Sequence, residues 1–394
     1  MTDQTKPHIS KRVLSIAPSA TKQVAVLAQQ VGGCVSLGQG VPSFPTPPHV
    51  VDAAVRALRD NPDSGKYTLQ PGLIPLREAI AADLEQRRSI KVDPLTEIGV
   101  TVGAMEGLLA AFMTIVDPGD EVIVPSPGYA SHIEQIVLAE GQPVFAPLNE
   151  NDWGLNVDRI RNAITPKTRA ILLCNPGNPT GAVFDDQSVR AVCDLALKHD
   201  LYVLADETYE FLVYDGPSPL SPSTLPEIKD RVITVASFSK KYAFTGWRVG
   251  WVHASPELMS QMMKVHDAAV IAAPTVSQYA ALAALTGPQE PYEMMRQELA
   301  ARRDLCLSRL DRLPEHFGYI RPGGAFYIMA RYLFSPEPSS ALAETFIRGP
   351  KVITVPGGSY GPGGEGHLRL SYGGTPEVIN EAFDRIERWL AEQK

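Results

Sequence analysis

Cysteine is scarce in this sequence. Four cysteines stand among 394 residues, far apart and with no Cys-x-x-Cys pair. We therefore expect neither a disulfide framework nor a metal site, and a chain of this length buries enough surface to fold without either. Few, unpaired cysteines are typical of a reducing compartment, and the first residues contain no apolar signal segment, so we expect a cytoplasmic protein. The cysteines are Cys34, Cys174, Cys193 and Cys306.

The sequence also lacks an excess of positive charge and has few long hydrophobic runs. The 36 basic residues are outnumbered by 44 acidic ones, and no basic cluster is longer than a pair such as Lys240–Lys241. A nucleic-acid partner is not expected without a basic patch. Residues 268–287 carry no charge over a membrane-spanning length, but they are rich in alanine and include Pro274. This segment favours a buried or interface helix, so we expect no membrane partner.

Short runs rich in valine and isoleucine alternate with segments of helical period in the middle of the chain. We expect strands at 121–124, 170–174, 202–205 and 232–236, and a helix at 187–198. This alternation predicts an α/β domain whose mostly parallel sheet is flanked by helices. After Gly287, a charged helix at 292–313, strands near 326–329, 351–355 and 368–371, and an amphipathic helix at 378–393 predict a smaller α+β domain.

Two glycine motifs near the C-terminus imitate catalytic signatures. Residues 357–361 fit the Gly-x-Ser-x-Gly elbow of serine hydrolases, but Pro362 follows in place of a helix, and few residues remain for an acid and a histidine. Residues 361–366 fit Gly-x-Gly-x-x-Gly, but an alternating strand pattern follows where a dinucleotide site needs a helix. We interpret both motifs as glycine turns.

Polar side chains follow three of the predicted strands directly. Asn178 lies in the turn after the first strand, Asp206 and Tyr209 follow the second, and Lys240 follows the third. Each residue alone has an ordinary explanation as a turn, a helix cap or a solvated side chain. Because parallel strands end at one edge of their sheet, however, we expect the four to meet in one crevice. A lysine that forms a Schiff base and an aspartate that keeps a pyridine ring protonated are what pyridoxal phosphate requires.

The ordered motifs of the chain resemble the pyridoxal-phosphate-dependent class I/II aminotransferases, of the aspartate aminotransferase superfamily and fold type I. The matches run in family order from about residue 37 to 372, and their number makes them specific. They are Asn-Pro-Gly-Asn-Pro-Thr-Gly (175–181), Asp-Glu-Thr-Tyr (206–209), Ser-Phe-Ser-Lys-Lys-Tyr-Ala-Phe-Thr-Gly-Trp-Arg-Val-Gly (237–250) and His-Leu-Arg-Leu-Ser (367–371), with weaker ones at 37–47 and 66–72.

The resemblance implies a domain division and a homodimer. It places an N-terminal segment, 1–47, against a small C-terminal domain, 288–394, with the large cofactor domain at 48–287. It also implies that Tyr67 reaches the cofactor phosphate of the neighbouring subunit, so that the active sites lie at the subunit interface.

The resemblance further assigns roles around the cofactor. Lys240 holds pyridoxal 5'-phosphate and moves a proton, Asp206 pairs with the pyridine nitrogen, and Tyr209 and Asn178 donate to the phenolic oxygen. Tyr129 stacks on the ring. The phosphate is expected at the N-terminus of a helical segment, where backbone N–H groups bind anions; its cup is formed by Gly103, Ala104, Met105, Ser237 and Arg248.

On the substrate side, the resemblance makes Arg369 the clamp for the α-carboxylate, with Asn178 and the backbone of Gly40 beside it. Lys241 departs from the family pattern, which often has threonine there, and leaves open which lysine bonds the cofactor. No second arginine for a distal carboxylate can be assigned, which favours neutral or apolar amino donors such as methionine or aromatic amino acids. Alanine, glutamate and aspartate remain open as alternative donors. We therefore expect an aminotransferase that acts on an L-amino acid and a 2-oxo acid by a ping-pong cycle.

Two alternatives remain open at this point. Another enzyme of the same fold, such as a β-lyase, decarboxylase or synthase, would use the same cofactor on an amino acid. A regulator built on an aminotransferase-like domain would carry an additional basic DNA-binding domain, and only about 36 residues precede the first motif.

Overall fold

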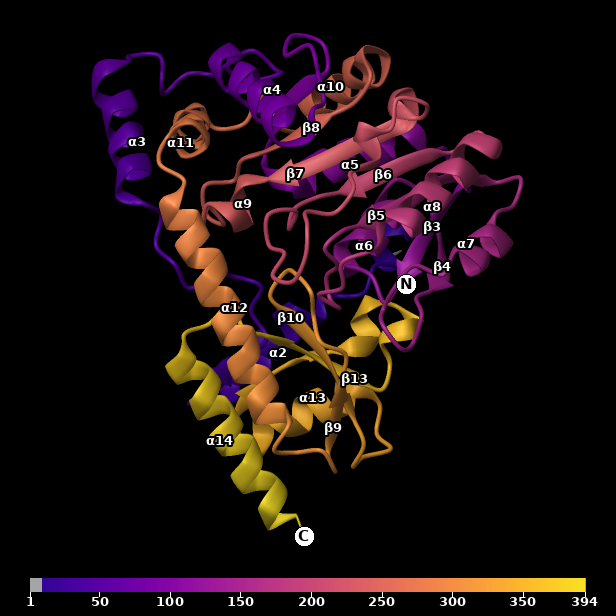
Figure 1. The fold of residues 1–394 in the computed structure, drawn as a ribbon, viewed down its shortest axis with the longest axis vertical. Helices are drawn as coiled ribbons and strands as arrows, with labels where there is room; N and C mark the ends of the chain where they lie inside the picture. Colours follow the sequence, from indigo (N-terminus) through magenta and orange to yellow (C-terminus); the bar gives the residue numbers. More distant parts are fainter. Residues whose placement is uncertain (1–8, 394) are drawn as a thin grey trace, which may run out of the picture.

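A seven-stranded sheet lies at the centre of the larger part of the molecule within residues 9–393, which the computed structural model describes (Figure 1). Neighbouring strands are parallel from β7 to β4, whereas β8 is antiparallel to both of its neighbours. The predicted mostly parallel sheet is confirmed. In spatial order the strands are β2 (Ile98–Thr101), β8 (Gly250–His253), β7 (Val232–Ser237), β6 (Tyr202–Asp206), β5 (Thr168–Cys174), β3 (Glu121–Ser126) and β4 (Gln142–Pro147).

Helices cover both faces of this sheet, which is why its central strands are continuous apolar runs. Successive residues of a strand point to opposite faces. Val122 and Val124 of β3 pack in one core with α5 and α10, whereas Ile123 packs in another with α7 and α8. The helices of this part are α3 (Pro48–Asp60), α4 (Ile74–Arg88), α5 (Gly103–Ile115), α6 (Ala130–Leu138), α7 (Val157–Ala163), α8 (Asp186–Lys198), α9 (Phe238–Lys241), α10 (Pro256–Val270) and α11 (Thr275–Thr286).

The uncharged segment 268–287 ends α10 and forms α11. Ala280, Ala281 and Ala284 of α11 are buried in a core with residues of α3 and α4. The expected buried helix is confirmed. Among the described residues, no helix combines the length and the apolar character that crossing a membrane requires.

The C-terminal part contains a second, antiparallel sheet in the order β12-β13-β10-β9. The predicted single strand at 351–355 is wrong: it is divided into β11 and β12, which belong to different sheets, with the buried Thr354 between them. The elements are β9 (Phe317–Tyr319), β10 (Tyr327–Tyr332), β11 (Val352–Ile353), β12 (Val355–Pro356), β13 (His367–Ser371), α12 (Glu290–Leu310), α13 (Ser339–Arg348) and α14 (Pro376–Glu392).

Residues near the N-terminus pack on this C-terminal part. β1 (Val35–Ser36) pairs in parallel with β11, and α2 (Ala20–Val31) packs against α13; a short helix, α1 (Lys11–Leu14), precedes them. Residues 1–8 of the expected N-terminal segment lie outside the described residues. The chain therefore returns to its beginning after building the large sheet.

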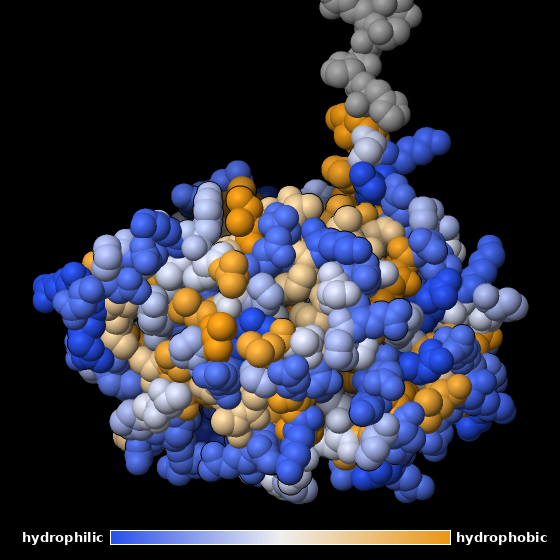
Figure 2. All heavy atoms as spheres, turned by 90° about the horizontal axis from the view of Figure 1, so that it is seen from above, coloured by the Kyte–Doolittle hydropathy of each residue, from blue (hydrophilic) through white to orange (hydrophobic). Residues whose placement is uncertain are grey.

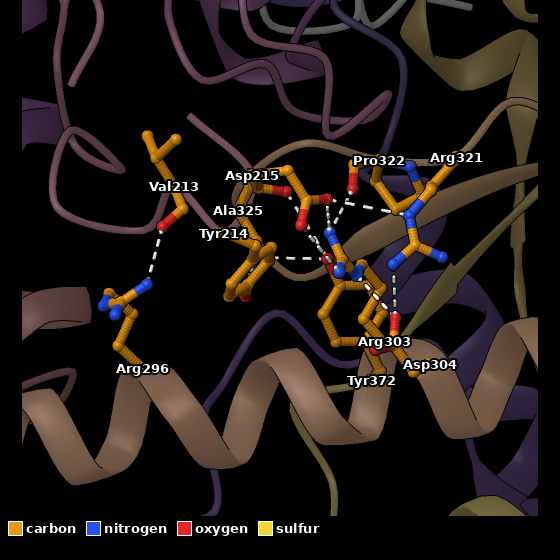
Figure 3. Close-up of polar contacts among 11 residues, drawn as sticks. Val213, Tyr214, Asp215, Arg296, Arg303, Asp304, Arg321, Pro322, Ala325 and Tyr372 are labelled. Carbon is orange, nitrogen blue, oxygen red and sulfur yellow. Dashed lines mark hydrogen bonds and ion pairs between the residues drawn. The ribbon is translucent and has the colours of Figure 1, made fainter. Parts of the chain in front are cut away.

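The long helix α12 runs from the large sheet into the C-terminal part (Figure 1) and joins the two through its arginines (Figure 3). Arg296 donates to the carbonyl of Val213 over 3.0 Å. Arg303 forms an ion pair with Asp215 and donates to the carbonyl of Pro322 over 3.1 Å. One helix thus holds the loop that follows β6 against the loop that leads into β10.

The glycine motifs at 357–366 form two short 3-10 helices, η3 (Gly357–Tyr360) and η4 (Pro362–Gly364), which lead into β13. A Cβ atom on Gly357 would lie 2.1 Å from the carbonyl oxygen of Gly364, so the two turns pack backbone to backbone. The interpretation as glycine turns is confirmed.

Candidate active site

A cavity of about 550 Å³ lies at the C-terminal edge of the parallel strands. Cys174, Asp206 and Ser237, at the ends of β5, β6 and β7, line it together with Arg369 of β13. All but two of the predicted site residues line this cavity; those that do are Gly40, Ala104, Met105, Tyr129, Asn178, Asp206, Tyr209, Ser237, Lys240, Arg248 and Arg369. The topology of the sheet therefore brings together residues that are more than 300 positions apart in the sequence.

The two predicted residues outside the cavity lie in different surroundings. Gly103 begins α5 directly behind Arg248, and a Cβ atom on it would lie 2.5 Å from a guanidinium nitrogen. Its φ of +71° is also one that glycine adopts without strain. Tyr67 is 77% exposed and lies apart from the cavity of its own chain.

Lys240 extends from the short helix α9 into the cavity. Its Nζ donates to the carbonyl of Gly40 over 2.5 Å and lies 5.8 Å from the centre of the Phe326 ring. Burial, with the positive charges of Arg369 and Arg248, lowers the pKa of Lys240 to about 8. A larger fraction of this amine is therefore neutral near pH 7 than of an exposed lysine, and the neutral amine is the form that acts as a base or a nucleophile.

The next residue, Lys241, points away from the cavity. It lines a small separate pocket with Asp83, Arg87, Glu207 and Glu210. There Glu210 forms ion pairs with Arg87 and Arg88. Of the two adjacent lysines, Lys240 is thus the one that reaches the crevice.

Asp206 ends β6 and is 5% exposed. One of its carboxylate oxygens lies 2.8 Å from Nε2 of His132, and the other accepts the N–H of Thr208 over 3.0 Å. Burial would raise the pKa of Asp206, but the interactions with His132 and Thr208 bring it below its ordinary value. The carboxylate is therefore held as an anion inside the protein.

His132 was not found by sequence reasoning. It lies on α6, three residues after Tyr129, and its ring lies edge-on to the Tyr129 ring at a centroid distance of 5.2 Å. Its Nδ1 is buried without a partner among the described residues. A lone histidine within a helix carries no local signal for this contact, because the contact arises where α6 packs against the end of β6.

Arg369 is buried on β13, with 3% of its surface exposed. Its guanidinium donates to the Oδ1 of Asn178 over 3.1 Å and to the carbonyl of Gly38 over 2.7 Å, and it lies 4.4 Å from the centre of the Tyr327 ring. Its Nε has no partner, and within residues 9–393 no carboxylate forms an ion pair with it. A buried cation without a counter-ion favours binding of an anionic group.

Tyr209 and Tyr327 join the two parts of the molecule across the cavity. Their hydroxyl groups lie 2.8 Å apart, and burial raises the pKa of both side chains. A Cβ atom on Gly40 would lie 2.6 Å from the Tyr327 hydroxyl, so a side chain at this position would displace that hydroxyl. Tyr327 was also missed, since it stands in no motif and its role depends on how β10 packs.

At the other end of the cavity, several groups form a site for an anion. Ala104 and Met105 lie in the first turn of α5, where backbone N–H groups have no helical partner. Arg248 is held there by the carbonyls of Val102, over 3.2 Å, and Thr245, over 3.1 Å. Ser237 ends the neighbouring strand.

These features fit pyridoxal phosphate, the group that the sequence resemblance implies. The cavity has an anion site at one end, a lysine amine and a buried carboxylate within it, and a second buried cation for a carboxylated substrate. Its volume lies in the range of small-molecule sites.

Comparison with known proteins supports the same family as the sequence motifs. Residues 33–386 match the family model described as aminotransferase class I and II. The chain is 37% identical to aromatic-amino-acid aminotransferase 2 of Thermococcus litoralis and to an aspartate aminotransferase of Pyrococcus abyssi, covering 98% of this chain and 99% of each relative. Among solved structures, the aspartate aminotransferase of Thermus thermophilus with maleate superimposes with a TM-score of 0.91 at 36% identity, covering 97% of this chain and 100% of that one. An alanine aminotransferase from Pyrococcus furiosus gives 0.92 at 30% identity, covering 98% and 100%.

Proposed function

The chain belongs to the class I and II aminotransferase family and is an enzyme that transfers amino groups, and on this premise we propose that the cavity is its active site and that pyridoxal 5'-phosphate is its cofactor. The observation that carries the proposal is the joint placement of the Lys240 amine, the buried Asp206 carboxylate and the Arg369 guanidinium, whose Nε is unpaired, around one cavity. When bound, the cofactor supplies an electron sink for negative charge at the substrate Cα.

In this proposal each residue acts on a stated atom. Asp206, oriented by His132, holds the proton on the pyridine nitrogen. The neutral Nζ of Lys240 accepts the proton that leaves the Cα of the amino acid in the first half-reaction. In the second half-reaction, the protonated Nζ delivers a proton to the Cα of the 2-oxo acid. Tyr209 and Asn178 donate to the phenolic oxygen, and Tyr129 covers the ring.

The two anionic groups are held at opposite ends of the cavity. Gly103, Ala104 and Met105 at the start of α5, with Ser237 and Arg248, bind the phosphate. Arg369 binds the α-carboxylate of an L-amino acid or a 2-oxo acid, assisted by Asn178 and by the backbone of Gly40. The two substrates occupy the same position in turn, as a ping-pong cycle requires.

Incubation of the holoenzyme with an amino donor alone tests this reaction. We expect release of one 2-oxo acid per active site and then no further turnover until a 2-oxo acid acceptor is added. The 2-oxo acid is measured by a coupled dehydrogenase, and free ammonia is measured in the same sample as the control. Continued turnover without an acceptor, with release of ammonia, would contradict transamination and favour a lyase.

We further propose a homodimer whose partner completes the phosphate site through Tyr67. Several hydrophobic side chains of α3 and the following loop are exposed in the single chain, among them Leu58 at 59% and Leu69 at 78%. Figure 2 shows the end of the molecule that carries α3 and α4, where hydrophobic side chains reach the surface between hydrophilic ones. Such exposure is typical of a surface that a second copy covers.

Leu69→Glu is expected to lower the mass measured by analytical ultracentrifugation from that of two chains to that of one chain. It is also expected to speed loss of the cofactor on dialysis. A charge at the centre of an apolar interface costs more than association gains, whereas an exposed position leaves the fold of one chain intact. Leu333→Glu, at a leucine 52% exposed in the C-terminal part, is the control. A wild-type protein that stays monomeric yet retains its cofactor would contradict the proposal.

The division of the chain into domains is also a proposal. We assign an N-terminal segment at 1–47, a cofactor domain at 48–287 and a small domain at 288–394, supported by the β1–β11 pairing and the course of α12.

We also propose a cytoplasmic location. All four cysteines are free, which supports a reducing, cytoplasmic environment.

A further inference from the structure

The helix α5, which begins at the proposed phosphate site, lacks an ordinary N-terminal cap. Its cap position is Val102, whose side chain accepts no hydrogen bond, whereas serine, threonine, aspartate or asparagine is usual there. A capping oxygen would take the N–H of the second or third helical residue, here Ala104 or Met105. The valine therefore leaves these two N–H groups available to an anion.

Glu106, in the first turn of α5, binds a different N–H group of this turn. Its Oε2 accepts the N–H of Val102 over 3.1 Å, in the manner of the glutamate of a capping box. Its side chain is 10% exposed and does not line the cavity. The carboxylate thus stabilises the turn without occupying the place where the phosphate is proposed to bind.

The carboxylate of Glu106 is in turn held by a histidine of another helix. Nδ1 of His266, a fully buried residue of α10, lies 3.1 Å from the same Oε2. The other carboxylate oxygen and Nε2 of His266 are buried without partners among the described residues. Because apolar side chains often replace such a buried pair without loss of stability, packing alone does not explain it.

The turn that Glu106 holds also holds the arginine of the proposed phosphate site. The carbonyl of Val102 accepts Nη2 of Arg248 over 3.2 Å, so Glu106 binds the N–H of this residue and Arg248 binds its carbonyl. The next residue is packed tightly, since a Cβ atom on Gly250 would lie 2.7 Å from the carbonyl carbon of Gly103. A shift of Val102 would therefore displace the guanidinium together with the first N–H groups of α5.

We propose that Glu106 and His266 are positioning residues of the phosphate site. Glu106 fixes the turn at Val102, and His266 fixes the carboxylate of Glu106. Neither residue lines the cavity, so both act through Val102. This inference rests on the proposed function, because it takes the start of α5 as the place where the phosphate of the cofactor binds.

The test compares the binding of pyridoxal phosphate with that of pyridoxal, which has the same ring without the phosphate, to the full chain freed of cofactor. In Glu106→Ala we expect the dissociation constant of pyridoxal phosphate to rise about 10-fold, which corresponds to one hydrogen bond, and that of pyridoxal to stay unchanged. Glu106→Gln keeps an acceptor oxygen for the N–H of Val102 and is expected to restore most of the affinity.

His266→Leu is expected to raise the dissociation constant of pyridoxal phosphate several-fold. This effect should vanish when Glu106 is already alanine, because His266 acts through that carboxylate. His253→Leu is the matched control, at a buried histidine of β8 whose Nδ1 also has no partner among the described residues. It should leave the preference for the phosphorylated compound unchanged.

Equal losses for the two compounds, an unchanged dissociation constant in Glu106→Ala, or additive effects of the two substitutions would overturn the positioning role. If Glu106→Ala does not fold, the ratio of the two dissociation constants in His266→Leu decides the question in the same way. A wild-type protein that binds pyridoxal phosphate no more tightly than pyridoxal would instead overturn the cofactor site of the proposed function.

Discussion

Replacement of Lys240 by alanine is expected to lower kcat for amino transfer by at least about 10³-fold, because the variant loses both the cofactor linkage and the base at the substrate Cα. The pKa of about 8 that burial and two arginines give this amine suits it to both tasks. Single-turnover formation of 2-oxo acid measures the loss of rate. Mass spectrometry after borohydride reduction measures the covalent link, which we expect on Lys240 in the wild type and not in the variant.

Lys241→Ala is the matched control, because it removes the adjacent amine. That side chain lies in a pocket with Asp83, Arg87 and Glu210, and Glu210 keeps its two arginine partners in the variant. We therefore expect the covalent link to persist and the rate to stay within a few-fold of the wild type. Transamination by Lys240→Ala, or a covalent link on Lys241, would show that the wrong lysine has been assigned.

The cluster of strand-end residues could be predicted from the sequence because two local signals combine. Buried parallel strands are apolar runs, so their ends are visible, and a polar residue directly after such a run lies at the edge of the sheet. Asp206 and Ser237 meet both conditions, Lys240 follows in the short helix after the third run, and all three line the cavity. Their convergence follows from the parallel pairing of β5, β6 and β7.

The residues that were missed depend on packing between elements distant in the sequence. His132 contacts Asp206 across 74 positions, and Tyr327 contacts Tyr209 across 118, and neither stands in a motif. The break at Thr354 was missed for a similar reason, since which sheet each half of 351–355 joins depends on the partners β1 and β13. Tyr67 lies apart from the cavity of its own chain, and its predicted role depends on the proposed homodimer.

Arg369→Gln should lower kcat/KM by about 10²- to 10⁴-fold for every amino acid, because two charge-assisted hydrogen bonds to the α-carboxylate are lost. Primary amines without a carboxylate should react slowly and at the same rate in both proteins. The same change should leave the melting temperature equal or raise it, since the folded chain no longer buries a cation whose Nε is unpaired.

Arg331→Gln, at an exposed arginine on the neighbouring strand β10, controls for loss of an arginine from this sheet and should change neither quantity. The pairing of lower activity with undiminished stability is what separates a substrate clamp from a structural residue. A structural arginine would show the reverse, with a lower melting temperature and an equal loss of rate for amines and amino acids. That result would show that the Arg369 side chain stabilises the fold and does not bind the substrate α-carboxylate.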